Sequence, residues 1–314
     1  MLRTILEGFG SLMIQIFTQV SMEGMVSSST IFMMLRWTTC LGKESLAIYY
    51  AVKTMTLPSR DTADGPILSY DDVEDRCQEI KTLILLQQEP RSPKVLFLLE
   101  YFYSRNATKT LVLVTELLQT GLKDVLEFLQ ISEYETRAVA KSILETIKFI
   151  HGKGVVHRDI KEANFMFREN GNPQTLTLID FRLARVLEAG ETDKSFCGST
   201  GYISPEMYFQ KPHSFGVDLF SFGVMLFKML SGGKSPWPLM PLDDLRRRTK
   251  DLEYNFDDWD RVVAPSAKAL IQHLLAPAEQ RLDAERALDQ EWFRVGLRRT
   301  SIEDSYLAFS SWQD

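Results

Sequence analysis

The sequence predicts an α+β fold with two lobes, in which a strand-rich N-terminal lobe is followed by a helical C-terminal lobe. Two observations lead to this prediction. The first third of the chain contains strand-length runs rich in β-branched and aromatic residues. From about Gly121 onward, apolar residues recur at helical spacing instead. With 314 residues the chain is long enough to bury a sizeable core, and we expect the lobes to meet near residues 117–121.

The N-terminal lobe is predicted from runs of β-branched and aromatic residues, which indicate strands at 13–20, 31–37, 47–53, 95–103 and 110–116. A polar turn over residues 104–109 joins the last two strands. Residues 58–70 contain Gly, Pro and Asp and predict a loop. A helix is predicted over residues 71–88, because its apolar residues fall on one face.

The C-terminal lobe begins with a predicted helix over residues 134–151, where Val139, Ile143 and Ile147 belong to one apolar stripe. Short strands are predicted at 155–156, 164–167 and 176–179. Helices resume at Asp218. The apolar run 219–230 is too short to span a bilayer and predicts a buried helix.

Composition excludes several classes of protein. The 36 basic and 42 acidic residues leave a net charge of −6, so we expect no nucleic-acid partner. Cys40, Cys77 and Cys197 are too few and too scattered for a disulfide framework or a zinc site. We therefore expect a reducing compartment, the cytoplasm, with the nucleus as the alternative. Polar residues interrupt the apolar segment 2–20 and no small-residue cleavage site follows, so we expect no signal peptide and no membrane partner.

Two short motifs carry the chemistry. The first is His157-Arg158-Asp159-Ile160-Lys161-Glu162-Ala163-Asn164, and the second is Ile179-Asp180-Phe181. Read as H-R-D-x-K-x-x-N followed by D-F, they resemble the catalytic loop and metal-binding motif of eukaryotic protein kinases. The lysine two residues after the aspartate resembles the Ser/Thr kinases. The resemblance covers about residues 20–293.

The resemblance implies a bilobal protein kinase fold. We expect an N-terminal extension over 1–12, a kinase domain over 13–296 with an N-lobe of 13–118 and a C-lobe of 119–296, and a C-terminal tail over 297–314.

The same resemblance assigns roles in phosphoryl transfer, with ATP as phosphate donor and Mg²⁺ as cofactor. Asp159 would accept or orient the proton of the acceptor hydroxyl, and Lys161 would reach the transferring phosphate. Asn164 and Asp180 would hold Mg²⁺ through oxygen atoms, which this ion prefers. Taken alone, each of these residues is an ordinary loop residue, and the prediction rests on their spacing.

Lys53, in the run Tyr50-Ala51-Val52-Lys53, resembles the strand lysine of the family and would also bind the nucleotide phosphates. Taken alone, Lys53 could equally be a solvated lysine at the end of a strand. Its partner in the family is a glutamate on the following helix. Glu79 fits best, and Glu74 is the second choice.

The predicted glycine-rich loop runs from Gly24 to Ile31 and departs from the family pattern G-x-G-x-x-G-x-V. Ser29 replaces the third glycine and leaves the backbone able to approach a phosphate. Val26 replaces the second glycine, and its β-branched side chain disfavours a positive φ where backbone N–H groups should hold the phosphates.

The adenine site is implied by the run Thr115-Glu116-Leu117-Leu118, which resembles the hinge between kinase lobes. Thr115 would be the gatekeeper, and the backbone groups of Glu116 and Leu118 would bond the adenine ring. The residues implied to sandwich the ring are Ile31, Ala51 and Met166.

Residues 180–206 resemble an activation segment and end in Gly198-Ser199-Thr200-Gly201-Tyr202-Ile203-Ser204-Pro205-Glu206. The family implies an ion pair between Glu206 and Arg281, and it implies that Asp218 braces the catalytic loop. Arg158 implies control by phosphorylation, with an upstream kinase placing a phosphate on Ser195 or Thr192. The alternative is that both residues carry unmodified, solvated hydroxyl groups with no role in control.

Arg182 stands where the family has glycine after Asp-Phe, and we expect arginine to be strained in backbone conformations that glycine permits. Together with Val26, Arg182 leaves two functions open. The first is an Mg-ATP-dependent serine/threonine kinase that transfers the γ-phosphate to protein hydroxyls, which we expect to be a monomer. The second is a pseudokinase that acts as an interaction or allosteric scaffold. The C-terminal half resembles the calcium/calmodulin-dependent and calcium-dependent kinases, and the N-terminal half has features of monopolar-spindle kinases.

Overall fold

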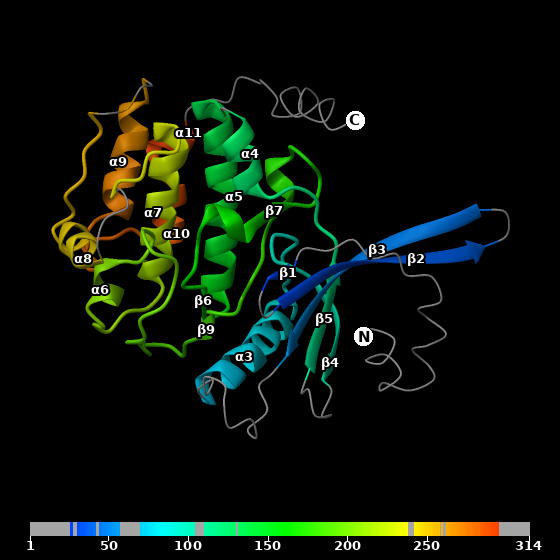
Figure 1. Ribbon diagram of the computed structural model, residues 1–314. Coiled ribbons are helices and arrows are strands. Elements are labelled where there is room, and N and C mark those ends of the chain that lie inside the picture. The colour runs from blue at the N-terminus through cyan, green and yellow to red at the C-terminus, as the bar shows by residue number, and fades with distance from the viewer. Residues whose placement is uncertain are drawn as a thin grey trace. The chain divides into compact units, whose positions relative to one another are not determined.

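The computed structural model describes residues 26–27, 30–41, 44–56, 70–103, 110–129, 131–237, 242–257, 259 and 262–294. The chain divides into two compact units (Figure 1). One consists of Met1–Cys77 and Leu96–Leu118, and the other consists of Gln78–Val95 and Gln119–Asp314. The first is built on a β-sheet and the second is mainly helical, which confirms the predicted α+β class.

The first unit contains a five-stranded antiparallel sheet in the order β1-β2-β3-β5-β4. Its strands are β1 (Val26–Ser27), β2 (Thr30–Leu41), β3 (Glu44–Thr56), β4 (Leu98–Tyr103) and β5 (Thr110–Glu116). The predicted strands at 31–37, 47–53 and 110–116 lie within β2, β3 and β5, and the one at 95–103 begins three residues later, at Leu98. The predicted strand 13–20, loop 58–70 and turn 104–109 lie outside the described residues, except for Tyr70.

Helix α3 (Tyr70–Leu86) corresponds to the helix predicted at 71–88, and the division between the units falls within it. Its C-terminal half belongs to the second unit. There Ile80 and Leu83 are buried, as the predicted apolar face requires, and Leu86 is buried as well. Ile84, which was predicted on the same face, is exposed, so that part of the prediction is wrong.

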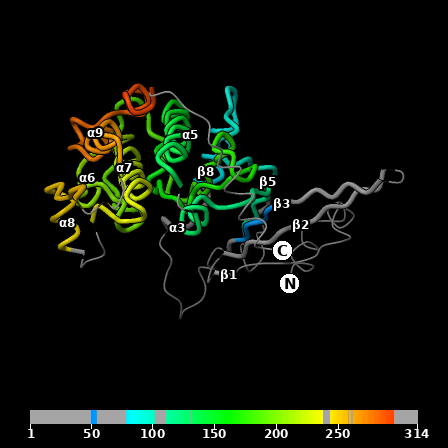
Figure 2. The backbone as a smooth tube through the Cα atoms, turned by 90° about the horizontal axis from the view of Figure 1, so that it is seen from above, coloured from blue at the N-terminus to red at the C-terminus, as the bar shows by residue number. Residues whose placement is uncertain are grey.

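The centre of the second unit is formed by α5 (Glu133–Gly152) and α7 (Gly216–Ser231), which pack against each other (Figure 2). Helix α5 begins with a capping box, in which Ser132 and Glu135 each satisfy the other's backbone N–H. Helix α7 is buried on almost all sides, as the apolar run 219–230 predicts, and ends at Gly232 with a left-handed φ of 78°.

Short elements follow α5 and present the two motifs. Strand β6 (Val155–Val156) pairs with β9 (Arg185–Val186), and β7 (Phe165–Phe167) pairs with β8 (Leu176–Leu178). The strand predicted at 164–167 begins at Phe165, because Asn164 still belongs to the 3₁₀ turn η1 (Glu162–Asn164). A second 3₁₀ turn, η2 (Pro173–Thr175), precedes β8.

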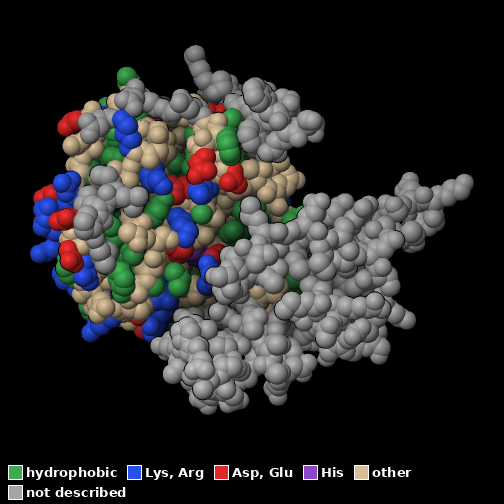
Figure 3. Space-filling model, in the orientation of Figure 1, with side chains coloured by type: hydrophobic (Ala, Val, Ile, Leu, Met, Phe, Trp, Pro, Cys, Tyr) green, Lys and Arg blue, Asp and Glu red, His purple; other side chains and the backbone are tan. Residues whose placement is uncertain are grey.

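The remaining helices of the second unit are α4 (Leu122–Phe128), α6 (Pro205–Tyr208), α8 (Leu242–Lys250), α9 (Pro265–Leu274), α10 (Ala284–Leu288) and α11 (Glu291–Arg294). The exposed basic residues of α8 form the blue patch at the left of Figure 3, while Arg246 is half-buried and donates to the carbonyl of Tyr208. Across the described parts of the chain, no helix is long and apolar enough to cross a bilayer.

Candidate active site

The catalytic loop follows β6 and is held by Asp218 at the start of α7. The Asp218 carboxylate accepts hydrogen bonds from the backbone N–H groups of His157, at 2.9 Å, and Arg158, at 2.8 Å. The ring of His151 lies 2.8 Å from the same carboxylate. Burial raises the pKa of Asp218, but the contacts with His151 and His157 outweigh it and the pKa falls below its usual value. The predicted bracing role of Asp218 is confirmed.

Asp159 lies at the centre of a polar cluster. Its Oδ2 accepts from Lys161 Nζ at 2.7 Å and from Asn164 Nδ2 at 3.0 Å. Lys161 Nζ also donates to Ser199 Oγ at 2.6 Å, which connects the loop to the activation segment. Oδ1 of Asp159 is buried and finds no hydrogen-bond donor among the described residues. This oxygen is therefore suited to accept a proton from a substrate.

A backbone hydrogen bond places Asp180 beside this cluster. The N–H of Ile179 donates to the carbonyl oxygen of Asn164 at 2.9 Å, so the residue that follows lies next to the catalytic loop. Phe181 is completely buried and packs edge-on against the ring of His157, with the centroids 5.1 Å apart. Asp180 adopts a left-handed φ of 62°, a conformation that aspartate tolerates better than most residues.

Arg182 turns back onto Asp180. Its Nε and Nη2 each lie 2.7 Å from one oxygen of the Asp180 carboxylate, which is a bidentate pair. The expectation that arginine at this position strains the backbone is wrong for this conformation, because Arg182 is not among the residues with positive φ. The left-handed residue is Asp180 instead.

The side chains at the predicted metal site offer the kind of ligand atoms that bind Mg²⁺. Asn164 Nδ2 donates to the carbonyl of Asp159 at 2.7 Å, which leaves the Asn164 side-chain oxygen as an acceptor. Together with the Asp180 carboxylate it offers the oxygen ligands that Mg²⁺ prefers. Within the described residues, no group of three or more His, Cys, Asp and Glu side chains could hold a metal, so Asn164 would be needed as a ligand.

The residues predicted to bind the phosphates are distributed over both units. Lys53 lies on β3 in the first unit, and Glu79 lies on α3 in the second; both are buried. Their pairing stays a prediction, as does the weaker choice of Glu74. Gly24 lies outside the described residues, and the backbone at Val26 forms β1.

The predicted adenine site also stays a prediction, but part of its hinge is described. Thr115 is buried, and its hydroxyl donates to the carbonyl of Glu116 at 3.2 Å. The N–H of Glu116 donates to the carbonyl of Phe97. Leu118 is buried. Ala51 and Met166 are half-buried, while the side chain of Ile31 lies outside the described residues.

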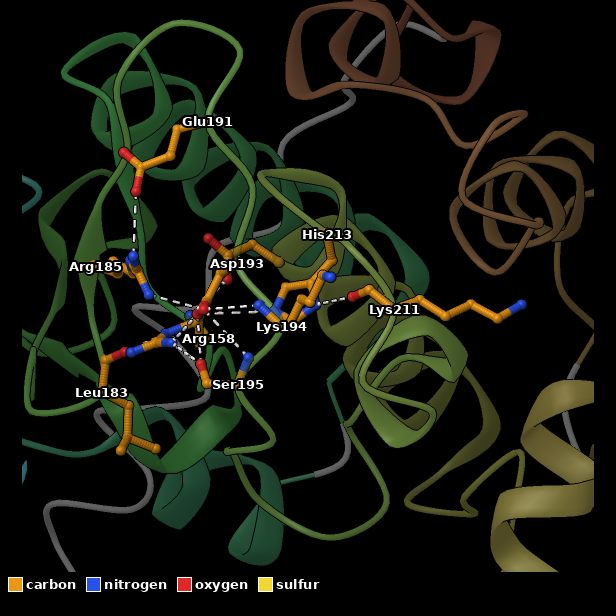
Figure 4. Close-up of polar contacts among 10 residues, drawn as sticks. Arg158, Leu183, Arg185, Glu191, Asp193, Lys194, Ser195, Lys211 and His213 are labelled. Carbon is orange, nitrogen blue, oxygen red and sulfur yellow. Dashed lines mark hydrogen bonds and ion pairs between the residues drawn. The ribbon is translucent and has the colours of Figure 1, made fainter.

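The activation segment is anchored by Asp193, a residue that sequence patterns did not indicate. The expected partner of Arg158 is a phosphate on Ser195 or Thr192. In the structure Arg158 pairs with the Asp193 carboxylate and also donates to the unmodified hydroxyl of Ser195 (Figure 4). The other oxygen of Asp193 accepts from Arg185 at 2.8 Å. In the sequence, the only signal of this role is that Asp193 is an acidic residue close to the predicted phosphorylation sites.

Further contacts hold Asp193 on all sides. Its carboxylate accepts from the Ser195 hydroxyl and from the N–H groups of Lys194, at 2.8 Å, and Ser195, at 3.2 Å. Its backbone exchanges two hydrogen bonds with His213. Burial raises the pKa of Asp193, but the bonds from Ser195 and the charge of Arg158 outweigh it and lower the pKa to about 2.

The end of the activation segment is fixed by the predicted pair of Glu206 and Arg281, which is confirmed. Arg281 Nη1 and Nη2 lie 2.5 and 3.2 Å from the two oxygens of Glu206, and both side chains are buried. Gly198 has a φ of 108°, and a Cβ there would lie 2.8 Å from the carbonyl oxygen of Arg158. Glycine is therefore required for this close approach.

A cavity of about 810 Å³ extends from Lys161, beneath α4, to the end of α7. Phe128, Ile131 and Met229 supply apolar surface to it. Glu162 lies in its wall and contacts Lys228, at 2.9 Å, and the Tyr202 hydroxyl. Because these charges compensate one another, the cavity has no strong preference for either sign of charge.

The fold and this site together have the features of the protein kinase class. The family model "Protein kinase domain" matches residues 39–293. The chain belongs to the eukaryotic protein kinase family, among relatives of the Ser/Thr type.

Curated relatives include the phosphorylase b kinase gamma catalytic chain, liver/testis isoform, of Mus musculus, which is 32% identical over 78% of this chain and 60% of its own length. Calcium-dependent protein kinase 14 of Arabidopsis thaliana is 28% identical over 74% of this chain and 43% of its own. Ribosomal protein S6 kinase 2 alpha of Gallus gallus is 29% identical over 84% of this chain and 33% of its own length. The chain thus spans 60% or less of the length of these relatives.

Proposed function

We propose that this chain is an Mg-ATP-dependent serine/threonine kinase that phosphorylates proteins. The observation that carries the proposal is the arrangement of Asp159, Lys161 and Asn164, in which one aspartate oxygen is bonded and the other is left to accept a proton. Lys53 and Asp180 are also retained, so the set of charged groups used by the family is complete.

In the proposed reaction, the oxygen of an acceptor hydroxyl forms a bond to the γ-phosphorus of ATP while the bond from that phosphorus to the β–γ bridging oxygen breaks. The hydroxyl proton passes to Asp159 Oδ1, and ADP leaves. Lys161, which already contacts Asp159 Oδ2, is placed to hold the phosphoryl oxygens during transfer. Mg²⁺, when bound by Asn164 and Asp180, would neutralise phosphate charge.

We further propose that the activation segment is ordered without phosphorylation. Asp193 already gives Arg158 a negative partner, and a phosphate on Ser195 would bring a second negative group against that carboxylate. An upstream kinase acting on Ser195 would then have to displace Asp193 from Arg158.

The acceptor protein would extend from Asp159 into the neighbouring cavity. Its apolar wall at Phe128 and Met229 and its compensated charges favour an apolar or uncharged side chain close to the phosphorylated residue. The remaining proposals, a monomeric state and a cytoplasmic or nuclear location, rest on composition alone.

Transfer of labelled phosphate from ATP to a mixed peptide library tests the proposal, with Asp159→Asn as the matched inactive control. We expect wild type to exceed this control by about 10²-fold or more, the range for loss of a general base. Equal rates for the two proteins would refute catalysis.

The pseudokinase alternative is favoured by one observation, the bonding of both Asp180 oxygens by Arg182. Thermal unfolding with ATP alone and with ATP plus magnesium addresses it, because a bound nucleotide stabilises the folded state. No change in melting temperature at millimolar ATP, with or without magnesium, would favour a scaffold without a nucleotide.

A further inference from the structure

Arg182 occupies the carboxylate that the family uses for metal binding. Its planar fork engages both oxygens of Asp180 at 2.7 Å, a geometry that lysine cannot reproduce. An arginine side chain stays protonated in proteins, and the negative charges of Glu79 and Asp159 also act on the Arg182 guanidinium. Arg182 is therefore a fixed cation among three carboxylates.

The charge of this part of the second unit depends on Arg182. The positive charge of Arg182 acts on the carboxylates of Asp180, Glu79 and Asp159. Without Arg182 this positive charge is lost, and a polyphosphate would be repelled more strongly. In other members of the family the divalent metal supplies this compensation.

The guanidinium is also accessible. Its side chain is 52% exposed, against 20% for Asp180, so Arg182 covers the carboxylate from the solvent side. The two bonds to Asp180 use two of the five N–H groups of an arginine, which leaves three that can point outward to an anion.

We propose that Arg182 is the resident counter-cation of Asp180, so that the chain binds a nucleoside polyphosphate without a divalent metal. A metal ion and Arg182 compete for the same two oxygens, because a metal can reach the Asp180 carboxylate only after both bonds from Arg182 break. This inference rests on the proposed nucleotide site and deepens it by naming the metal-free nucleotide as the ligand that the resting chain binds. The magnesium proposed for phosphate transfer would bind Asp180 only after displacing Arg182 from it.

Nucleotide and metal binding by the whole chain test the inference without measuring catalysis. Binding of a fluorescent ATP analogue is measured in EDTA and over a series of magnesium concentrations. Variants are Arg182→Ala, Arg182→Lys and, as the matched control, Arg286→Ala, which removes an exposed arginine that pairs only with Asp283. Binding of Mn²⁺ to nucleotide-free protein is followed in parallel by electron paramagnetic resonance.

We expect wild type and Arg286→Ala to bind the analogue with less than about threefold difference between EDTA and magnesium. Arg182→Ala should lose about tenfold or more of the metal-free affinity, the size expected for one charge-assisted contact. The magnesium concentration at which the effect of magnesium on analogue binding is half-maximal should also be about tenfold lower for Arg182→Ala than for wild type. Arg182→Lys should have a metal-free affinity between those of wild type and Arg182→Ala, because lysine keeps the positive charge but cannot form the bidentate pair.

Identical magnesium dependence in wild type and Arg182→Ala would overturn the inference and leave the proposed kinase function standing. If no protein binds the analogue, the proposed function fails, and the Mn²⁺ measurement decides on Arg182 separately. Tighter Mn²⁺ binding by Arg182→Ala, about tenfold, would support competition at Asp180, and equal Mn²⁺ binding would reject it. Arg182→Lys serves the same comparison if the alanine variant does not fold.

Discussion

The carboxylate of Asp193 forms a buried ion pair with the guanidinium of Arg158, the residue directly before the catalytic aspartate. The pair joins the activation segment to the catalytic loop across 35 positions of the sequence. Arg158 is further fixed by its Nε, which donates to the carbonyl of Leu183 at 2.6 Å. The position of Arg158, and with it Asp159, therefore depends on a carboxylate that is part of the chain.

Asp193→Asn should lower the rate of phosphate transfer by about ten- to a hundredfold, the effect of misplacing a catalytic group by roughly 1 Å. The amide leaves the charge of Arg158 uncompensated, while Arg185 keeps its pair with Glu191. Glu191→Gln is the matched control, because Glu191 contacts Arg185 and the N–H of Glu188 at the exposed edge of the cluster and does not contact Arg158. Ser195→Ala should retain most activity. A loss in Ser195→Ala alone would instead support control by phosphorylation.

Stability should depend on Asp193 in acid. Its pKa is about 2 in the folded chain, below the ordinary 3.8, so the ionised carboxylate stabilises the fold. This contribution is complete above pH 4 and is lost as the pH falls from about 4 to 2. Urea unfolding should show wild type more stable than Asp193→Asn by about 1–2 kcal/mol at pH 6, with the difference shrinking below pH 4. A difference that stays constant down to pH 3 would contradict the assignment.

Glu206→Ala should destabilise the chain by about 3–5 kcal/mol, because it leaves the buried guanidinium of Arg281 without its carboxylate. The double variant with Arg281→Ala should cost less than the sum of the two single changes. For comparison, Lys148→Ala breaks the exposed pair with Glu285 and should cost less than about 1 kcal/mol. Chemical denaturation of wild type and the four variants measures all these values, and strictly additive effects would argue against the pair.

Asp218→Asn should destabilise the catalytic loop. The aspartate uses one oxygen for the N–H of Arg158 and the other for the N–H of His157, whereas asparagine has only one acceptor. One buried N–H then loses its partner, at a cost of about 1–3 kcal/mol. Unfolding measurements together with kinase assays check this, with the exposed Asp244→Asn as control. A variant as stable as wild type would mean that the loop does not need this brace.

Much of the fold could be predicted because it depends on local patterns. The apolar stripe of α5 and the all-apolar run of α7 are properties of neighbouring residues, and both helices lie where these patterns predict them. Boundaries were less accurate. Asn164 belongs to a 3₁₀ turn instead of the strand, because its side chain bonds back to Asp159.

The candidate site was predictable where the motif spacing is short. Asp159, Lys161 and Asn164 are within five residues of one another, and a loop of this length brings them together. Asp193 was missed, because an isolated aspartate between polar residues carries no pattern. Arg182 was recognised as a departure, but its consequence depends on the side-chain conformation that directs the guanidinium onto Asp180.

By itself, the sequence determined the α+β class and, through its motifs, the kinase family, and it predicted the catalytic groups, since these depend on patterns and spacing along the chain. Only the tertiary structure decided which groups meet Asp193 across distant segments: the guanidinium of Arg158, 35 positions away, and the backbone of His213. The physical reason is that such pairs require burial and matched geometry. These depend on how helices and loops pack, and no local periodicity records them.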